Sequence, residues 1–368
     1  MHETLIEVRN LEVAFPIRER KLFGARTAML RAVDGVSFDI RRGETVGLVG
    51  ESGSGKTTVG RAILRAIDPT GGEVIYHTAR GDVDLAHADE RALRKLRPQL
   101  QMVFPEGRVQ LHDLKGEALR LFRPRMSLVF QDPYSSLNPR MTVRDIIAEP
   151  LIAGGLMRDR KAIDARVREI AARCKLDLEH LRRFPHAFSG GQRQRICIAR
   201  ALVSKPDFVV CDESVSALDV SIQAEIVNLL KDLQEEMGVA FLFIAHDLSV
   251  VAQISDRVAV MYVGQFVEYA PTRKLFFTPR HPYTHALLSA VPIADPDLAF
   301  APVRLKGEIP NPMNAPAGCR FHTRCPQAQA RCRIEAPAWR EIAPEHFVAC
   351  HFAENFDFSR PELTDESN

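Results

Sequence analysis

Apolar and polar positions along this chain separate short buried strands from amphipathic helices. Three apolar runs, at residues 44–50, 207–213 and 239–247, have the length and composition of buried strands. Residues 192–204 predict a helix, and so do residues 222–237, where apolar side chains recur at three- and four-residue spacing. Strands that alternate with helices in this way predict an α/β domain.

The two ends of the chain differ from this pattern of apolar and polar positions. The first forty residues predict strands and turns, and residues 160–174 are charged and helical in character. After about Val267, prolines become frequent and the regular periodicity fades, which indicates an appended domain. We therefore expect a main domain at 1–267 and an extension at 268–368.

Composition narrows the functional classes. The 368 residues carry 49 basic and 47 acidic side chains, and this balance of +2 gives no overall argument for binding nucleic acid. The first ten residues lack the apolar core of a signal peptide. No apolar run approaches the roughly 18–20 residues of a membrane helix. We expect a cytoplasmic chain whose membrane role, if it has one, comes through a partner.

One segment of the chain is duplicated. Residues 83–106 align with residues 109–132 at an offset of 26, and nothing continues the period. The second copy leads directly into Gln131, whereas Pro105 stands at the equivalent place in the first copy. We predict that the second copy forms the helix and strand before Gln131 and that the other copy is an insertion.

A glycine-rich loop follows the first buried strand. Residues 50–57, GESGSGKT, fit the phosphate-loop pattern G-x4-G-K-[ST] and precede a predicted helix at 57–66. Backbone N–H groups in such a loop turn towards phosphates, and the helix N-terminus adds positive potential. Lys56 supplies a charge to the β and γ phosphates, and Thr57 offers a hydroxyl to Mg²⁺. The alternative, a glycine-rich turn with a surface lysine, is disfavoured by the strand and helix on either side. The nucleotide-binding residues expected here are Gly50, Ser52, Gly53, Gly55, Lys56, Thr57 and Thr58.

Two carboxylates end the second buried strand. Asp212 is expected to hold Mg²⁺, directly or through water, and Glu213 to orient the attacking water and accept its proton. Such a pair is weak evidence alone, but together with the phosphate loop it indicates nucleotide hydrolysis.

A serine and two glycines open the helix before these acids. Ser189, Gly190, Gly191 and Gln192 form a second candidate anion site at a helix N-terminus. Taken alone the segment would be a helix cap, but it lies about 20 residues before the paired carboxylates.

With these motifs in this order, residues 4–270 resemble the ATP-binding cassette (ABC) ATPases. The resemblance implies an α/β phosphate-loop domain with a RecA-like core, an antiparallel β subdomain and a helical subdomain at about 132–200. It also implies that two such domains pack head to tail. Each ATP then lies between the phosphate loop of one subunit and Ser189, Gly191, Gln192 and Asp219 of the other.

The resemblance assigns further roles. Gln131 matches the glutamine loop, which contacts Mg²⁺ and the attacking water and borders the membrane-subunit docking surface. The segment Ser216–Asp219 matches the loop that crosses the dimer interface. His246, otherwise an ordinary loop residue, matches the switch histidine at the γ-phosphate. Phe15 is the candidate to stack on adenine, with Phe23 as an alternative and a core role open for both.

The chain is most similar to the ATPase subunits of dipeptide and oligopeptide importers, in the form of the second, F-type subunit. The segments that carry this similarity are 32–58, 131–143, 246–268 and 281–292, the last reading HPYTHALLSAVP. The duplication departs from the family, as does Ala187, where an acid is common. The similarity implies a second ATPase subunit in a homo- or heterodimer, two transmembrane permease subunits, indirect contact with an extracytoplasmic solute-binding protein, and a peripheral place at the cytoplasmic membrane face.

Four of the seven cysteines cluster in the extension, with the spacing C-x5-C-x6-C-x17-C. An odd number of cysteines argues against a disulfide framework. Four thiolates can bind Zn²⁺ or an iron–sulfur cluster, or can remain free. The family resemblance favours a [4Fe–4S] cluster held by Cys319, Cys325, Cys332 and Cys350.

Two other functions compete with transport. A soluble ABC ATPase of DNA repair or translation usually carries coiled-coil insertions or two cassettes, and neither is present here. A nucleotide-binding regulator without turnover is disfavoured by the intact set Lys56, Asp212, Glu213 and His246. We therefore predict an ATPase that energises an ABC importer for peptides or a related solute, with ATP and Mg²⁺ as cofactors and no nucleic-acid partner.

Overall fold

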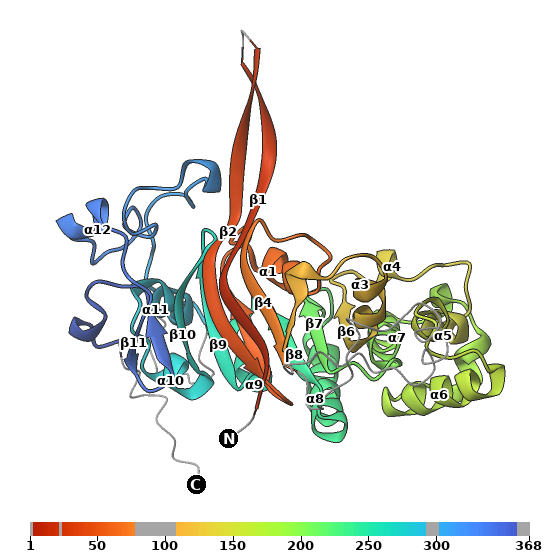
Figure 1. The fold of residues 1–368 in the computed structure, drawn as a ribbon. Helices are drawn as coiled ribbons and strands as arrows, with labels where there is room; N and C mark the ends of the chain where they lie inside the picture. The colour runs from red at the N-terminus through yellow and green to blue at the C-terminus, as the bar shows by residue number, and fades with distance from the viewer. Residues whose placement is uncertain (1–2, 22–23, 78–107, 292–301, 359–368) are drawn as a thin grey trace, which may run out of the picture.

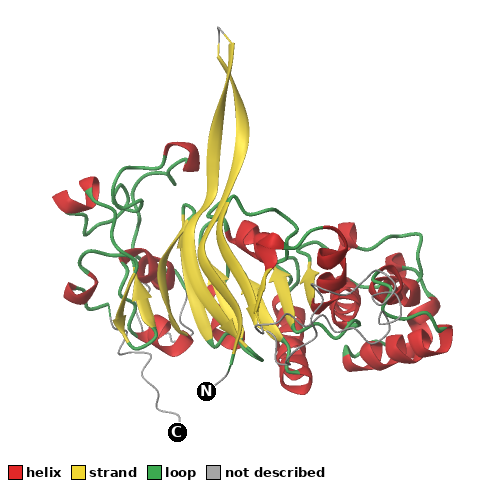
Figure 2. Ribbon diagram, viewed as in Figure 1, coloured by secondary structure: helices red, strands yellow, loops and turns green. Residues whose placement is uncertain are grey.

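The computed structural model describes residues 3–21, 24–77, 108–291 and 302–358. Two β-sheets form its centre (Figures 1 and 2). The antiparallel sheet has the order β2-β1-β4-β5, with bounds β1 Thr4–Lys21, β2 Gly24–Arg41, β4 Gly71–His77 and β5 Arg108–Gln110. The larger sheet has the order β11-β12-β10-β9-β3-β8-β7-β6. Its strands are β3 Thr45–Val49, β6 Met126–Val129, β7 Phe208–Asp212, β8 Ala240–Ile244, β9 Arg257–Tyr262, β10 Gln265–Pro271, β11 Arg340–Ala343 and β12 His346–Val348.

Helices cover these sheets and form a lobe to one side, on the right of Figure 1. The helices of the core are α1 Lys56–Ile63, α3 Gly116–Phe122, α8 Val220–Met237 and α9 Leu248–Ile254. Those of the lobe are α4 Pro133–Ser136, α5 Val143–Ala153, α6 Arg160–Arg173 and α7 Gly190–Leu202. Those of the C-terminal part are α10 Thr272–Phe277, α11 Pro282–Ser289 and α12 Ala330–Ile334. None of these described helices is long and apolar enough to span a bilayer.

The three apolar runs are the central strands β3, β7 and β8, and every residue in them is buried. Their side chains alternate between two cores. Leu242 and Ile244 pack towards the antiparallel sheet and α1, whereas Phe241 and Phe243 pack towards the helices on the other face. Because both faces are covered, these strands are apolar throughout.

Parallel pairing brings the ends of these strands to one edge of the sheet. β8 lies between β3 and β7 and is parallel to both, and β6 is parallel to β7. In the register, Leu48 and Asp212 both pair with Ile244. The chain segments that follow β3, β7 and β8 therefore leave the sheet at the same level, which is where ligands bind in open α/β sheets.

The duplicated segment is described only in its second copy. Within residues 109–132, α3 and the edge strand β6 form, and Gln131 follows β6 by two residues. This matches the predicted helix and strand before Gln131. The first copy, 83–106, lies outside the described residues.

The C-terminal extension continues the main sheet. β12 pairs antiparallel with β10 through Glu268 and Val348, and β11 pairs with β12. The expected boundary between 267 and 268 thus falls inside β10. The extension packs as an edge of the same sheet, on the left of Figure 1.

Candidate active site

The catalytic residues expected from sequence meet at the carboxyl edge of the central strands. Gln131 Nε2 donates a hydrogen bond of 2.7 Å to Glu213 Oε2, and His246 Nδ1 lies 3.8 Å from the same oxygen. Thr57 Oγ1 donates to Asp212 Oδ1 over 2.7 Å. Segments after β3, β6, β7 and β8 therefore supply one constellation.

The phosphate loop connects β3 to α1 in a conformation that requires glycine. Gly50, Ser52, Gly53 and Gly55 lie in the loop, and Lys56, Thr57 and Thr58 open α1. Gly55 has a φ of 107°, and a Cβ there would lie 2.2 Å from the Ala32 carbonyl oxygen. No side chain caps the N-terminus of α1, so its first N–H groups are available to an anion.

Lys56 is enclosed by this loop. Its Nζ donates to the carbonyl oxygens of Gly50 and Glu51, over 2.8 and 3.1 Å. Burial lowers the pKa of Lys56, while Glu213, Asp212 and Glu51 act in the opposite direction. The Ser54 hydroxyl is buried and has no hydrogen-bond partner among the described residues. A lysine charge and an unsatisfied hydroxyl in one loop fit a polyphosphate.

Thr57 and Asp212 fit a magnesium ion by their chemistry. Both present oxygen atoms, which Mg²⁺ prefers, and Asp212 is only 3% exposed. Arg61, one helical turn after Thr57, lies 3.6 Å from the second Asp212 oxygen. Sequence reasoning missed Arg61, although its i+4 spacing from Thr57 was a usable signal.

Glu213 has a backbone conformation that sequence did not reveal. Its φ is 48°, in the left-handed region that non-glycine residues rarely occupy. The Glu213 N–H donates to the Ile244 carbonyl over 2.9 Å, and its carbonyl accepts from the Ser216 hydroxyl. These bonds hold the turn at the residue where the chemistry is expected.

The serine segment caps its own helix. The Ser189 N–H donates to Gln192 Oε1 over 3.0 Å, and the Gln192 N–H donates to Ser189 Oγ over 3.3 Å. Both residues are exposed, and among the described residues no hydrogen bond or ion pair joins them to the phosphate loop. Gly191 permits close packing, since a Cβ there would lie 2.5 Å from Ile222. Asp219, also exposed, caps α8 through the Ile222 N–H.

Phe15 lies on β1 opposite Leu30 and packs, half-buried, against the core between the two sheets. Leu30 is two residues from Ala32, whose carbonyl borders Gly55. The packing gives the ring a core role, and its stacking on adenine stays a prediction. Phe23 lies outside the described residues.

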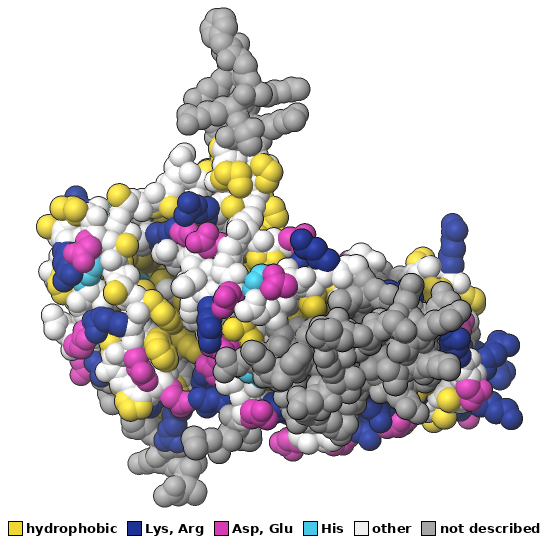
Figure 3. Space-filling model, in the orientation of Figure 1, with side chains coloured by type: hydrophobic (Ala, Val, Ile, Leu, Met, Phe, Trp, Pro, Cys, Tyr) yellow, Lys and Arg dark blue, Asp and Glu magenta, His cyan; other side chains and the backbone are white. Residues whose placement is uncertain are grey.

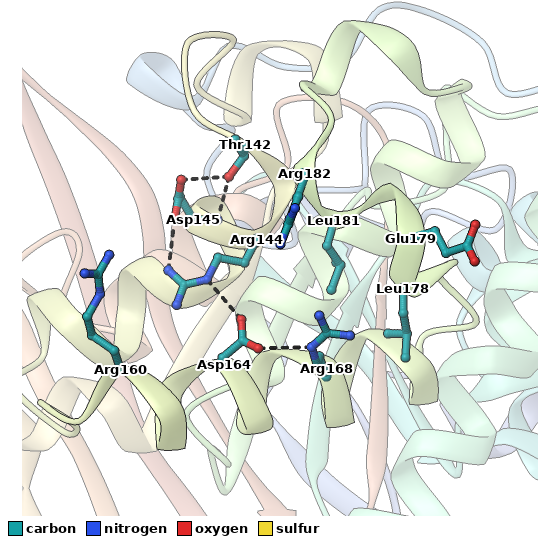
Figure 4. Close-up of a pocket in the computed structure, with 10 residues that line it drawn as sticks. All are labelled: Thr142, Arg144, Asp145, Arg160, Asp164, Arg168, Leu178, Glu179, Leu181 and Arg182. Atoms are coloured by element: carbon teal, nitrogen blue, oxygen red, sulfur yellow. Dashed lines mark hydrogen bonds and ion pairs between the residues drawn. The ribbon is translucent and has the colours of Figure 1, made fainter.

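A pocket of about 670 Å³ lies elsewhere, in the helical lobe (Figure 4). Its charges are largely paired: Asp164 accepts from Arg144 and Arg168 over 3.4 and 3.0 Å, and Arg144 also donates to Asp145. No residue of the phosphate loop or the paired acids lines it. This pocket therefore does not compete as the nucleotide site.

Two of the four cysteines of the extension are joined through their backbones, since the Cys319 N–H donates to the Cys332 carbonyl oxygen over 2.8 Å. Burial raises the pKa of Cys325 to about 12, and Cys319, Cys350 and Cys332 add to this rise. All four thiols are free. As placed, however, no group of three or more His, Cys, Asp or Glu side chains in the described part of the chain is arranged to hold a metal ion. The expected [4Fe–4S] cluster gains no support from this arrangement.

Comparison with known proteins shows the family of the chain. Residues 33–216 match the family model for ABC transporters, and residues 267–332 match the C-terminal region of oligopeptide/dipeptide transporters. The chain is 46% identical to the oligopeptide transport ATP-binding protein AppF of Bacillus subtilis, over 95% of this chain and 97% of that protein. It is 47% identical to a putative peptide import ATP-binding protein of Brucella ovis, over 90% of this chain and 94% of that protein.

A solved structure shows the same fold. The ATP-binding cassette MJ0796, in a dimeric post-hydrolysis state bound to ADP and Pi, is similar with a TM-score of 0.56 and 26% identity. The similarity covers 73% of this chain and 99% of that one.

Proposed function

This chain belongs to the ABC transporter family, as an ATP-hydrolysing subunit of the oligopeptide/dipeptide importer class, and we propose from its site how each residue serves that activity. The observation that carries the proposal is the contact of Gln131, Glu213 and His246 at one carboxylate, beside the Thr57–Asp212 pair. Transport ATPases and soluble ABC ATPases share the cassette, but the match at 267–332 favours transport.

In this proposal the residues divide the chemistry of ATP hydrolysis. Lys56 and the N–H groups of the loop and α1 bind the β and γ phosphates. Glu213 orients the attacking water and accepts its proton, and Gln131 holds that carboxylate in place. We assign His246 to the γ-phosphate, because its ring lies 3.8 Å from the Glu213 carboxylate. Thr57, Asp212 and Gln131 would hold Mg²⁺, which supplies positive charge against the phosphates.

The second half of each ATP site comes from another subunit. Ser189, Gly191, Gln192 and Asp219 lie at the exposed N-termini of α7 and α8. Helix N-termini attract anions, and the fixed Ser189–Gln192 cap keeps the α7 terminus in shape. We assign these residues to the ATP held by the phosphate loop of a second ATPase subunit.

A groove next to Gln131 suits the membrane partner. It measures about 550 Å³ and lies between the core and the helical lobe, with Phe130, Pro150, Ala153 and Met126 among its lining. Phe130 is 41% exposed and directly precedes Gln131. We propose that a permease subunit docks here, at the cytoplasmic membrane face, and that two permeases and an external solute-binding protein complete the importer.

On the face shown in Figure 3, the described residues form no basic patch that would favour nucleic acid instead. On the face shown in Figure 3, lysine and arginine side chains are interspersed with aspartate and glutamate. A nucleic-acid site would gather positive charge into one patch.

We propose a structural [4Fe–4S] cluster at Cys319, Cys325, Cys332 and Cys350, because the extension supplies four free thiols, the donors that such clusters use, although these thiols are not arranged for a metal ion in this structure. Iron and sulfide content after anaerobic purification measures it. Protein that contains neither iron nor zinc would leave the thiols free and end this assignment.

Glu213→Gln tests the catalytic assignment. We expect turnover to fall by about 10²–10⁴-fold, since a positioned base contributes that much, while ATP binding persists and a dimer is trapped. Glu235→Gln, on an exposed part of α8, is the matched control. Unchanged turnover in Glu213→Gln would remove Glu213 as the base.

In the reconstituted importer, peptide-loaded binding protein should stimulate ATPase activity. No stimulation would remove the peptide assignment.

A further inference from the structure

The C-terminal extension contacts the phosphate loop at Glu51. Arg324 donates to both carboxylate oxygens of Glu51, from Nη1 over 2.6 Å and from Nη2 over 3.0 Å. The Glu51 N–H donates to the Tyr283 hydroxyl over 3.0 Å. Arg324 and Tyr283 lie 273 and 232 positions beyond Glu51 along the chain. Together they hold the side chain and the backbone of this one loop residue.

Arg324 is a fixed side chain. It is 9% exposed, against 26% for Glu51, and its guanidinium lies 5.9 Å from the centre of the Tyr262 ring. Tyr262 packs against Tyr283 and Phe321, with ring centres 4.7 and 5.2 Å apart. The salt bridge to Glu51 raises the pKa of Arg324 further above its ordinary value. A bidentate pair on such a support is stronger and more directional than a mobile surface pair.

Glu51 is in turn linked to the lysine at the phosphates. Lys56 Nζ donates to the Glu51 carbonyl and to that of Gly50. The position of Glu51 therefore sets one of the two backbone acceptors that orient Lys56.

A second arginine of the same segment fixes the far side of the loop. Arg320 donates to Asp34 and to the Val263 carbonyl. The neighbouring Gly264 N–H donates to the Ser54 carbonyl over 2.9 Å, within the phosphate loop. Arg320 and Arg324 both lie between Cys319 and Cys325, so one short segment reaches the phosphate loop by two routes.

We propose that Arg324 is a positioning residue for ATP binding, through which the C-terminal extension holds the phosphate loop in its binding conformation. Arg324 acts on the loop through Glu51 and does not touch the nucleotide. The proposal rests on the ATP-binding role of Lys56 given above, and it adds a role for the extension.

The test compares Arg324→Ala, Glu51→Ala and the double variant in the full-length chain. Equilibrium binding of a fluorescent ATP analogue gives Kd, and steady-state hydrolysis gives KM and kcat. We expect Kd and KM to rise about three- to tenfold in each variant, because a partly buried bidentate pair of this kind is lost. The double variant should lose no more than either single variant, and kcat at saturating ATP should stay within about twofold.

Arg331→Ala is the matched control. Arg331 also makes a bidentate pair in the extension, with Glu335, but that pair is exposed and remote from the loop. We expect it to leave Kd, KM and kcat unchanged. Arg324→Lys keeps the positive charge but loses the bidentate hydrogen bond, so it should recover part of the ATP affinity.

Three results would overturn the proposal: Arg324→Ala binding ATP like Arg331→Ala, multiplicative losses in the double variant, or a fall in thermal stability and kcat with KM unchanged. The last would make Arg324 a structural residue only. Failure of the proposed function is seen separately, as wild-type protein without turnover or Glu213→Gln with full turnover.

Discussion

Glu268 offers a stringent test of how the extension is attached. Its carboxylate is fully buried on β10 and accepts from the Arg280 N–H over 2.7 Å, from the His281 N–H over 3.0 Å and from His346 Nε2 over 2.7 Å. These bonds join the main sheet to the start of α11 and to β12. Glu268→Ala removes all of them at once.

The structure gives the size of the effect. Each N–H left without an acceptor costs about 1–3 kcal/mol, so losing the acceptor of two backbone N–H groups predicts a destabilisation of about 2–6 kcal/mol. Glu268→Gln keeps one carbonyl oxygen but turns an NH2 group towards the other N–H, so a smaller loss of about 1–3 kcal/mol is expected for it. Because α11 carries Tyr283, Glu268→Ala should also weaken ATP binding.

Hydrogen exchange followed by mass spectrometry measures this locally, over β12 and α11, and urea unfolding measures it for the whole chain. We expect faster exchange in both elements for Glu268→Ala, with exchange in β7 and β8 much less affected. The reasoning is refuted if Glu268→Ala and Glu268→Gln lose equal stability, or if β12 keeps its wild-type protection.

Two further predictions follow from single residues. Gly55→Ala should reduce ATP affinity by more than tenfold in an equilibrium titration, because its Cβ would lie 2.2 Å from the Ala32 carbonyl oxygen. A Cβ at Gly53 would have nothing within 4 Å, so Gly53→Ala should show only the smaller effect of its positive φ. Equal losses of affinity in the two variants would contradict this. Burial lowers the pKa of His281 to about 3, so the folded state keeps this ring neutral while the unfolded state takes up a proton below about pH 6.5. The neutral His281 ring therefore contributes fully to the free energy of unfolding above pH 6.5. This contribution is lost as the pH falls towards 3, by up to about 1.4 kcal/mol per pH unit. His281→Asn, which keeps a side-chain acceptor for the Tyr283 N–H, should reduce this slope in urea unfolding at pH 5 and 8; an unchanged slope would assign it to other groups.

The sequence by itself determined the chemistry of the nucleotide site. The phosphate loop, the acids after β7 and the histidine after β8 are local patterns, and their strands are identified by short apolar runs. The motif order also carries the family resemblance, which assigned Lys56, Asp212, Glu213 and His246 to one ATP site. The second copy of the duplication could be placed too, because it runs directly into Gln131.

Only the tertiary structure decided the contacts between distant segments. The pairing of β10 with β12 places the start of the extension inside a strand, the four thiols are not arranged to hold a metal ion, and Arg324 binds Glu51. The left-handed turn at Glu213 was equally invisible. The reason is physical: periodicity and glycine patterns record what each residue needs from its neighbours in sequence. Which buried charge meets which partner depends on the packing of the whole chain, and no local pattern records that choice.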